Sequence, residues 1–244
     1  MSFVLDAAGI LRVPEWLELP WLVHGFTTPA AGDFTRSRCD ETGMAAGIKV
    51  SGMRVRTLRQ VHSRRLVVVN GNYGSPRGAE DEEADGVITS RPGEVVAVRT
   101  ADCVPILLLD RRKHVVAAVH AGWRGTVAEI ARRSVESASA EFGCHPERLE
   151  AAIGPAIGAC CFEVGEEVAA QFDPSLIQSN AKPHIDLIEA NRRQLIQAGL
   201  RDELIRSANT CTFCAPQELY SFRRQGPSSG RMLAFAGIRQ IAEV

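Results

Sequence analysis

The chain has 244 residues, 45% hydrophobic and 23% charged, so it can bury a full core and does not have the composition of a disordered segment. Its 28 lysines and arginines nearly balance 29 aspartates and glutamates, with no long block of one sign, which argues against binding nucleic acid or anionic lipid by bulk charge. Seven scattered cysteines, an odd number, argue against a disulfide framework and for reduced thiols.

The first part of the chain predicts neither a signal peptide nor a membrane span. Residues 1–6 contain no basic side chain, and Arg12, Glu15 and Glu18 interrupt the apolar residues that follow. We therefore expect a cytoplasmic protein. Residues 30–52 are rich in Gly, Asp, Ser and Thr and show little periodicity, which predicts a surface loop.

Short apolar runs bounded by turn residues predict a series of buried strands. A polar, glycine-rich stretch at residues 71–85 predicts a surface loop after the first of them. A weaker strand candidate lies at residues 149–153. The other predicted strands lie at residues 66–69, 94–99, 105–110, 114–120 and 231–241, the last of these after a predicted loop at residues 227–230.

Two amphipathic helices have clear boundary signals. The first is predicted to open with the T-x-x-E capping box that begins at Thr126 and to end at Gly143. The second is predicted to open at Asp186 and to end at Gly199. Together with the strands, these helices predict an α/β protein, which we expect to form one domain over residues 1–244.

His62, Cys103 and His120 are candidate metal ligands because each adjoins a predicted strand. Imidazole and thiolate are side chains that zinc prefers, and three protein ligands leave one tetrahedral position for water or substrate, as in catalytic sites. The three residues are far apart in the chain, so their spacing alone does not distinguish a metal site from three unrelated side chains. A metal-free alternative is an amide hydrolase in which His120 activates a Cys103 thiolate.

Cys211 and Cys214 form a C-x-x-C, and residues 145–147 form an H-x-E, as in cytidine-deaminase zinc sites. Thr210 stands where that motif has proline, and the H-x-E lies in a predicted loop, so we reject that site. The C-x-x-C lacks signals of a strand-to-helix turn, which favours two partly buried thiols over a redox pair.

Cys160 and Cys161 lie in a glycine-rich segment, residues 154–165, between a predicted strand and a helix expected to begin near Glu163. The segment lacks the Gly-Lys-Ser/Thr ending of a phosphate loop. It predicts close backbone packing or a wall of a pocket.

Arginines near these motifs are candidate anion contacts. Arg124 lies two residues before the predicted N-cap Thr126, where free N–H groups favour an anion, although a surface arginine in a turn explains it equally well. Arg223 and Arg224 follow Phe222 and suit either a phosphate or base contact or a solvated pair.

Taken together, the phrases resemble the YfiH family, also called DUF152 and the laccase-domain or multicopper polyphenol oxidase family. The resemblance extends from Arg59 to near the carboxyl terminus. It is carried by ordered phrases at residues 60–62, 84–89, 100–105, 120–125, 153–158, 185–187, 211–212 and 221–224. It implies a layered α-β-β-α fold with mixed sheets, distantly similar to a toxin class that uses a Cys-His pair.

The resemblance also implies that His62, Cys103 and His120 bind zinc. It implies phosphorolysis of purine nucleosides such as adenosine, inosine and methylthioadenosine, together with adenosine deamination. The expected partners are therefore a purine nucleoside and phosphate, without nucleic acid or membrane. The amino-terminal Gly-Gly-x-Ser and Asn-rich segments of the family are absent, and Phe222 replaces a tyrosine.

Roles follow for the residues beside these motifs. Asp85 or Asp102 is the candidate proton acceptor, in a catalytic group that also includes Cys103 and His120. The basic residues expected to contact phosphate or ribose are Arg59, Arg124 and Arg223.

Other functions use the same residues. A multicopper oxidase needs paired His-x-His ligands, but none of the six histidines forms such a pair, so zinc is preferred, while one copper remains compatible with a His2Cys site. Editing of peptidoglycan precursors and a non-catalytic regulatory protein that carries zinc are the remaining alternatives.

Overall fold

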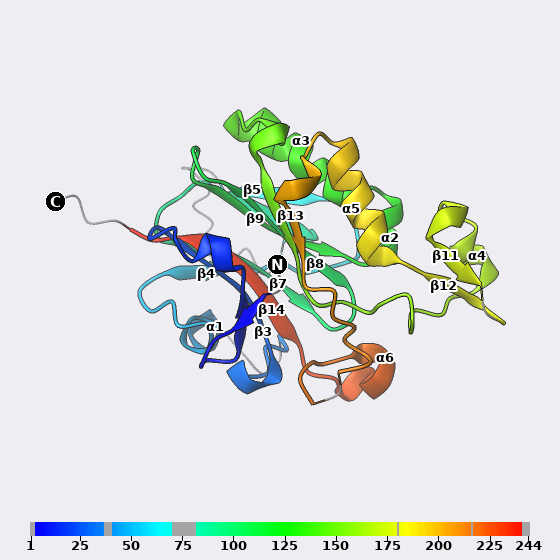
Figure 1. Ribbon diagram of the computed structural model, residues 1–244. Coiled ribbons are helices and arrows are strands. Elements are labelled where there is room, and N and C mark those ends of the chain that lie inside the picture. Colours follow the sequence, from blue (N-terminus) through cyan, green and yellow to red (C-terminus); the bar gives the residue numbers. More distant parts are fainter. Residues whose placement is uncertain (1–2, 37–40, 70–81, 180, 216, 241–244) are drawn as a thin grey trace.

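The computed structural model describes residues 3–36, 41–69, 82–179, 181–215 and 217–240. Two six-stranded sheets lie face to face, and helices cover the outer face of each, giving four layers in the order α-β-β-α (Figure 1). The layered mixed α/β fold predicted from the sequence is confirmed. No helix in the described part of the chain has the length and apolar character that a bilayer span requires.

The first sheet combines strands from both ends of the chain. Its order is β1 (Val4–Leu5), β2 (Ile10–Arg12), β3 (Leu22–Thr27), β14 (Met232–Ile238), β7 (Glu94–Thr100) and β4 (Arg54–Arg56). The predicted strand at residues 231–241 is confirmed over residues 232–238 as β14, and its predicted last residue lies outside the described residues. It lies in the middle of the sheet, antiparallel to both β3 and β7.

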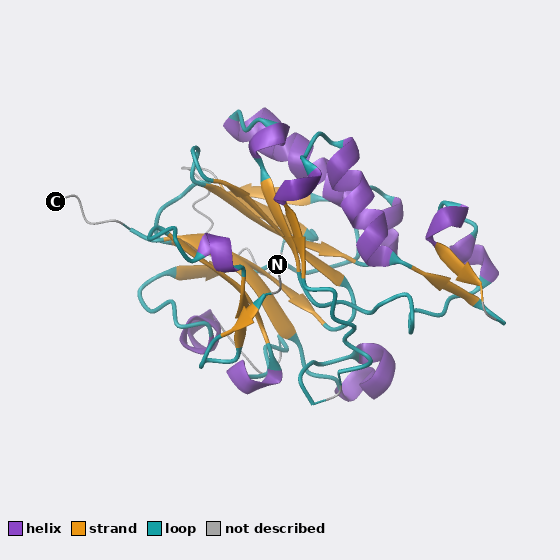
Figure 2. Ribbon diagram, viewed as in Figure 1, coloured by secondary structure: helices purple, strands orange, loops and turns teal. Residues whose placement is uncertain are grey.

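The second sheet holds most of the other predicted strands. Its order is β13 (Ile205–Ser207), β10 (Glu150–Ile153), β8 (Val104–Asp110), β9 (Val115–Ala121), β6 (Gly86–Thr89) and β5 (Leu66–Val69). β8 and β9 are antiparallel, whereas β5 pairs with β6 in parallel, so the sheet is mixed. A two-stranded sheet, β11 (Ile177–Ser179) and β12 (Pro183–Ile185), lies with α4 (Glu166–Ala169) to one side of the sandwich (Figure 2).

The alternation of side chains along each strand creates the layers. In β9, Val115, Ala117 and Val119 pack outward with residues of α3 (Ile130–Phe142) and α5 (Leu187–Gln197). Val116 and Ala118 face inward and join the core between the sheets. By this alternation, His120 is placed on the inner face, near the end of β9.

The boundary of the first predicted helix is wrong at its start. Gly122 is the N-cap of a short helix, α2 (Trp123–Val127), and Thr126 is buried within it. The Thr126 hydroxyl caps no backbone group and instead accepts a hydrogen bond from Asn191 Nδ2 at 2.9 Å. Glu129 adopts a left-handed conformation between α2 and α3. The end of α3 at Gly143 is confirmed.

The second predicted helix is confirmed at its start. The Asp186 carboxylate accepts a hydrogen bond from Glu189 N at 2.8 Å, so Asp186 is the N-cap of α5. α5 ends shortly before Gly199, which has a left-handed φ of 101°. The helix expected near Glu163 is α4, which begins only after its N-cap Gly165.

The last short helix is α6 (Phe222–Gln225). The described residues also form the 3-10 helices η1 (Pro14–Trp16), η2 (Pro29–Ala31), η4 (Pro146–Arg148), η5 (Pro174–Leu176), η6 (Asp202–Leu204) and η7 (Gly226–Ser228).

The described part of residues 30–52, which excludes 37–40, does not form the predicted surface loop. It contains the end of η2 and the helix α1 (Glu41–Gly47), and it buries Phe34, Met44 and Ile48 against the outer face of the first sheet. The irregular spacing of these apolar residues hides the pattern in the sequence. The predicted loop at residues 71–85 lies largely outside the described residues, and its last residue, Asp85, is fully buried.

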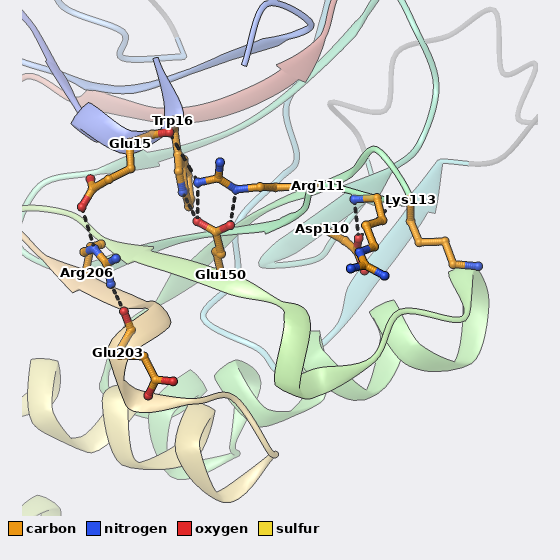
Figure 3. A network of polar contacts seen from close by, with 9 residues as sticks. Glu15, Trp16, Asp110, Arg111, Lys113, Glu150, Glu203 and Arg206 are labelled. Carbon is orange, nitrogen blue, oxygen red and sulfur yellow. Dashed lines mark hydrogen bonds and ion pairs between the residues drawn. The ribbon is translucent and has the colours of Figure 1, made fainter. Parts of the chain in front are cut away.

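A polar network fastens η1 to the second sheet (Figure 3). The Glu150 carboxylate accepts a hydrogen bond from Trp16 Nε1 at 2.7 Å and is paired with the Arg111 guanidinium. Arg206 on β13 donates to the Glu15 carboxylate at 3.2 Å. The network therefore joins the segment between β2 and β3 to β10, to β13 and to the turn that follows β8.

Candidate metal centre and active site

His62, Cys103 and His120 lie together although they are distant in the sequence. One ligand atom from each lies within 4.8 Å of the others. Cys103 Sγ is 3.9 Å from His62 Nε2, and the two imidazole rings meet edge to face with 4.9 Å between their centroids. His120 is buried, Cys103 half-buried and His62 exposed, so the cluster opens on one side. The described residues thus bring together all three candidate ligands.

The pairing of β8 with β9 explains why Cys103 and His120 meet. Val104 opposes Ala121 and Pro105 opposes His120, so the start of β8 and the end of β9 share one edge of the sheet. His62 comes from the loop that leads into β5 and adopts a left-handed φ of 59°. Asp102, before Cys103, has a φ of 90°. One candidate ligand, His62, and the neighbour of another, Asp102, therefore adopt backbone conformations that are sparsely populated for residues other than glycine.

Asp85 holds the His62 loop and His120 in position through hydrogen bonds. Its fully buried carboxylate accepts hydrogen bonds from His120 Nδ1 at 2.9 Å, His62 N at 3.0 Å and Ser63 N at 2.6 Å. Burial alone would raise the pKa of Asp85, but its hydrogen bonds with His120 and Ser63 outweigh burial and lower it. The bond to Nδ1 leaves Nε2 as the ring nitrogen available to a ligand, an arrangement typical of metal-binding histidine.

The charges of Cys103 and His120 stabilise each other. Burial opposes ionisation of both groups, but their mutual attraction lowers the pKa of Cys103 to about 6 and, with Asp85, raises the pKa of His120 to about 9. Cys103 is therefore a thiolate near neutral pH, the form that binds metals and attacks electrophiles.

Gln60 fixes the loop that carries His62. Its amide donates to Arg99 O and accepts from Arg99 N, both at 2.8 Å, in the manner of a strand partner at the end of β7. This clamp ties the His62 loop to the first sheet, while Cys103 and His120 belong to the second. Gln60 belongs to one of the phrases that carry the family resemblance, but nothing in the local sequence indicates this positioning role.

Asp102 ties three further segments to the cluster. Its carboxylate accepts hydrogen bonds from Thr212 Oγ1 and from Arg223 N, each at 2.6 Å. Its carbonyl oxygen accepts from Ile157 N at 2.8 Å. Asp102 therefore holds residues from three parts of the chain beside Cys103.

A cavity of about 490 Å³ opens over the three candidate ligands. Its charged lining is strongly basic, with five arginines and one carboxylate, Asp102, among the lining residues that the structure describes. The arginines are Arg36, Arg59, Arg99, Arg223 and Arg231. The apolar lining residues are Leu58, Ala101, Ile157, Phe162 and Phe222. Guanidinium groups suit an anion such as phosphate, and aromatic rings suit a planar base.

The candidate phosphate contacts differ in position. Arg59 and Arg223 line the cavity, and the Arg223 guanidinium also lies over the Phe162 ring at 5.4 Å. Arg124 is exposed on α2, where its guanidinium stacks on the Trp123 ring at 4.2 Å, and it is not among the lining residues. Sequence reasoning missed Arg36, Arg99 and Arg231, because each comes from a segment without a recognisable motif.

Comparison with known proteins places this geometry in context. The family model of the multi-copper polyphenol oxidoreductase laccase matches residues 36–239. A purine nucleoside phosphorylase of Bacteroides thetaiotaomicron is 35% identical over 221 residues, covering 85% of this chain and 82% of the relative. Adenosine deaminase RL5, from an unknown prokaryotic organism, is 40% identical over 193 residues, covering 74% of this chain and 72% of the relative.

Two solved structures share the fold of this chain. YlmD from Geobacillus stearothermophilus superposes with a TM-score of 0.84 at 30% identity, covering 98% of this chain and 99% of that one. YfiH from Bacillus licheniformis superposes with a TM-score of 0.83 at 27% identity, covering 97% and 99% of the two chains. The chain therefore belongs to the multi-copper polyphenol oxidoreductase laccase family, whose solved members include YfiH and YlmD.

Proposed function

We propose that this protein is a zinc-dependent purine nucleoside phosphorylase that also deaminates adenosine. The observation that carries the proposal is a His2Cys cluster at the base of a cavity lined by arginines and aromatic rings. Relatives named for these two activities are 35% and 40% identical to the chain.

The donor set fits zinc better than a multicopper centre. Two imidazoles and one thiolate are ligands that zinc accepts, and the Asp85 contact to His120 supplies the outer support common in zinc sites. Zinc bound by His62, Cys103 and His120 would act as a Lewis acid with a position open to water, phosphate or substrate. None of the six histidines forms the His-x-His pair of a multicopper cluster.

The chain's own residues would bind and orient the substrates. Arg59 and Arg223 are placed to hold phosphate, and the rings of Phe162 and Phe222 can pack against the purine. In phosphorolysis a phosphate oxygen bonds to ribose C1′ as the glycosidic C–N bond breaks, and the departing base takes up a proton. In deamination water adds to the purine ring carbon and ammonia leaves.

We assign different roles to the two candidate acids. Asp85 already accepts five hydrogen bonds, so we assign it the orientation of His120 and of the His62 loop. Asp102 lines the cavity beside Cys103, and each of its oxygens accepts one hydrogen bond, which leaves a lone pair on each. Asp102 is therefore our candidate proton acceptor.

Product analysis with adenosine tests this proposal. Zinc-loaded protein should yield adenine and ribose 1-phosphate only when phosphate is present, and inosine and ammonia in its absence, with no oxygen uptake. Cys103→Ser should abolish both reactions. Oxygen-dependent oxidation of a phenol, with nucleosides untouched, would instead support an oxidase.

The close thiolate–imidazolium pair supports a second candidate, a metal-free amide hydrolase that uses Cys103 as nucleophile. This enzyme would keep its activity after removal of zinc by a chelator and lose it on alkylation of Cys103. A zinc enzyme would lose activity with the chelator and regain it when zinc is returned.

A further inference from the structure

Four cysteines gather at a second place in the structure, apart from the His62–Cys103–His120 cluster. Cys160 and Cys161 follow β10, and Cys211 and Cys214 follow β13. The four sulfur atoms lie within 4.8 Å of one another. Cys161 Sγ is 3.4 Å and Cys160 Sγ is 3.8 Å from Cys214 Sγ. We call this group the four-cysteine cluster.

These separations match ligands around one ion better than disulfides. A disulfide brings its sulfurs to about 2.05 Å, far closer than the sulfurs of this cluster. Four thiolates bound tetrahedrally to zinc at about 2.3 Å are about 3.8 Å apart. The 3.4 Å and 3.8 Å separations from Cys214 Sγ lie close to that value, and the other sulfurs of the cluster are no more than 4.8 Å apart. The cluster is thus compact enough for all four sulfurs to bind one zinc ion.

Apolar packing does not explain the cluster. An isolated free cysteine is usually buried as a small hydrophobic side chain, as Cys144 is in this protein. In the cluster, Cys160 and Cys214 are exposed, and Cys161 and Cys211 are only half-buried. Four thiols at the surface contribute little hydrophobic stabilisation, but they form a complete set of ligands for one metal ion.

The backbone around the cluster supports the ligands as a zinc site requires. Gly158 N donates to Cys211 Sγ at 3.3 Å. A Cβ at Gly158 would lie 3.2 Å from Cys160 Sγ and 3.3 Å from Cys211 Cβ, so glycine allows the two segments to approach. The Arg224 guanidinium donates to Thr212 O at 2.7 Å and Phe213 O at 2.8 Å, which fixes the turn between Cys211 and Cys214.

We propose that Cys160, Cys161, Cys211 and Cys214 bind one structural zinc ion. Four protein ligands fill the tetrahedron, so this ion has no position for substrate. The four thiols release their protons to solvent as the ion binds.

The bound ion would hold the wall of the cavity. Phe162, which follows Cys161, lines the cavity, and Thr212, which follows Cys211, holds the Asp102 carboxylate. The cluster joins these two segments at a point where each has little regular secondary structure. The zinc would therefore act as a cross-link behind the active site.

Elemental analysis of purified, reduced protein tests this proposal. Wild-type protein should hold about two zinc ions per chain, and the double substitution Cys160→Ser/Cys214→Ser should hold about one. Cys144→Ala, which removes a cysteine outside the cluster, should retain both. Wild-type protein with only one zinc, lost completely in Cys103→Ala, would overturn the four-cysteine site and leave the proposed catalytic site intact.

X-ray absorption at the zinc edge gives a test that does not depend on folding of the double variant. In Cys103→Ala, which lacks one ligand of the proposed catalytic site, the remaining zinc should have sulfur neighbours only. Nitrogen neighbours on that zinc would refute the assignment. Recovery of the four cysteines as disulfides from zinc-replete, reduced protein, detected by mass, would also refute it and favour a redox role.

Discussion

Gly122 leaves the space in which the candidate metal ligands meet. A Cβ at this position would lie 2.7 Å from His62 Cδ2 and 3.2 Å from Cys103 Sγ. Its φ of −70° suits any residue, so the constraint is one of space and not of backbone conformation. The tight H-A-G-W phrase after β9 is thus explained by the packing of the site itself.

We therefore expect Gly122→Ala to push His62 away from Cys103 and to weaken zinc binding by about 10- to 100-fold, as changes next to metal ligands typically do. Competition with a chromogenic chelator measures this effect. The thermal unfolding midpoint should change little. Unaltered zinc affinity in Gly122→Ala would show that the loop relaxes, and would remove the steric argument.

Arg223 and Arg124 provide a matched pair of arginines for phosphate binding. Arg223 lines the cavity, whereas Arg124 lies outside it on α2. Arg223→Gln should weaken phosphate binding by about 1.5–3 kcal/mol, the range for hydrogen bonds to charged groups, and so raise the KM for phosphate in phosphorolysis. Arg124→Gln is the control and should change it far less. Initial rates at varied phosphate concentration measure both, and a larger effect at Arg124 would contradict the cavity as the phosphate site.

His24 should make the stability of the protein depend on pH. This histidine is buried, and its Nε2 accepts a hydrogen bond from Val13 N at 3.0 Å, which requires the neutral ring. Burial and the nearby Arg12 charge lower the pKa of His24 to about 3. The unfolded chain, with an ordinary pKa near 6.5, therefore binds this proton more readily than the folded protein.

The sign of the effect follows directly. His24 contributes no pH dependence above about pH 6.5, and below it the free energy of unfolding falls by about 1.4 kcal/mol per pH unit until the pH approaches 3. Urea unfolding at pH 7.5 and pH 5 should show a smaller difference for His24→Gln than for the wild type. His145→Gln, at an exposed histidine, is the control. Equal differences in wild type and His24→Gln would mean that His24 becomes protonated without unfolding.

Individual residues were predictable from the sequence where chemistry and strand pattern coincided. His62, Cys103 and His120 each combine a metal-binding side chain with an apolar run. Arg36, Arg99 and Arg231 carry no such signal, since arginine is common at surfaces and their shared cavity exists only after the fold is complete.

At the level of elements, the sequence predicts strands better than helix starts. The strand predicted at residues 66–69 matches β5, because a run of leucine and valine between polar turns strongly favours a buried strand. The T-x-x-E signal at Thr126 fails because tertiary contact overrides local capping: the Thr126 hydroxyl accepts a hydrogen bond from Asn191 on α5. In the four-cysteine cluster, two pairs that looked unremarkable separately meet only because β13 pairs with β10 in parallel.

The link between η1 and the second sheet should contribute strongly to stability. Glu150 is buried and accepts from Trp16 and Arg111 (Figure 3), so its removal leaves a buried indole N–H and a partly buried guanidinium without their acceptor. We expect Glu150→Ala to lower the free energy of unfolding by about 2–3 kcal/mol.

Glu150→Gln should have a smaller effect because its amide oxygen can still accept from Trp16. Glu147→Ala, at an exposed glutamate on η4, is the control for a change in charge. Urea unfolding at pH 7 measures all three variants. A loss below about 0.5 kcal/mol in Glu150→Ala would show that η1 is held mainly by apolar packing.

For the whole molecule, the sequence predicts the class of fold but not the order of strands. Apolar runs and two amphipathic helices are enough to predict an α/β protein, and the layered α-β-β-α arrangement is implied only by the family resemblance. The strand order depends on contacts between segments far apart in the chain, such as Ala234 opposite Phe26, for which local patterns carry no information. The sequence pattern does not locate the helix that covers the first sheet, because α1 is short and the apolar residues around it are irregularly spaced.

The central place of β14 has a consequence for synthesis of the protein. β3 and β7 leave the ribosome long before residues 232–238, yet each pairs with β14 and not with the other. Until then, the nascent chain holds two apolar strands with open edges, which are prone to aggregate or to bind chaperones. The first sheet can close only after residues 232–238 have emerged, so a nascent chain stalled before β14 should remain sensitive to protease even where β8 and β9 have already paired.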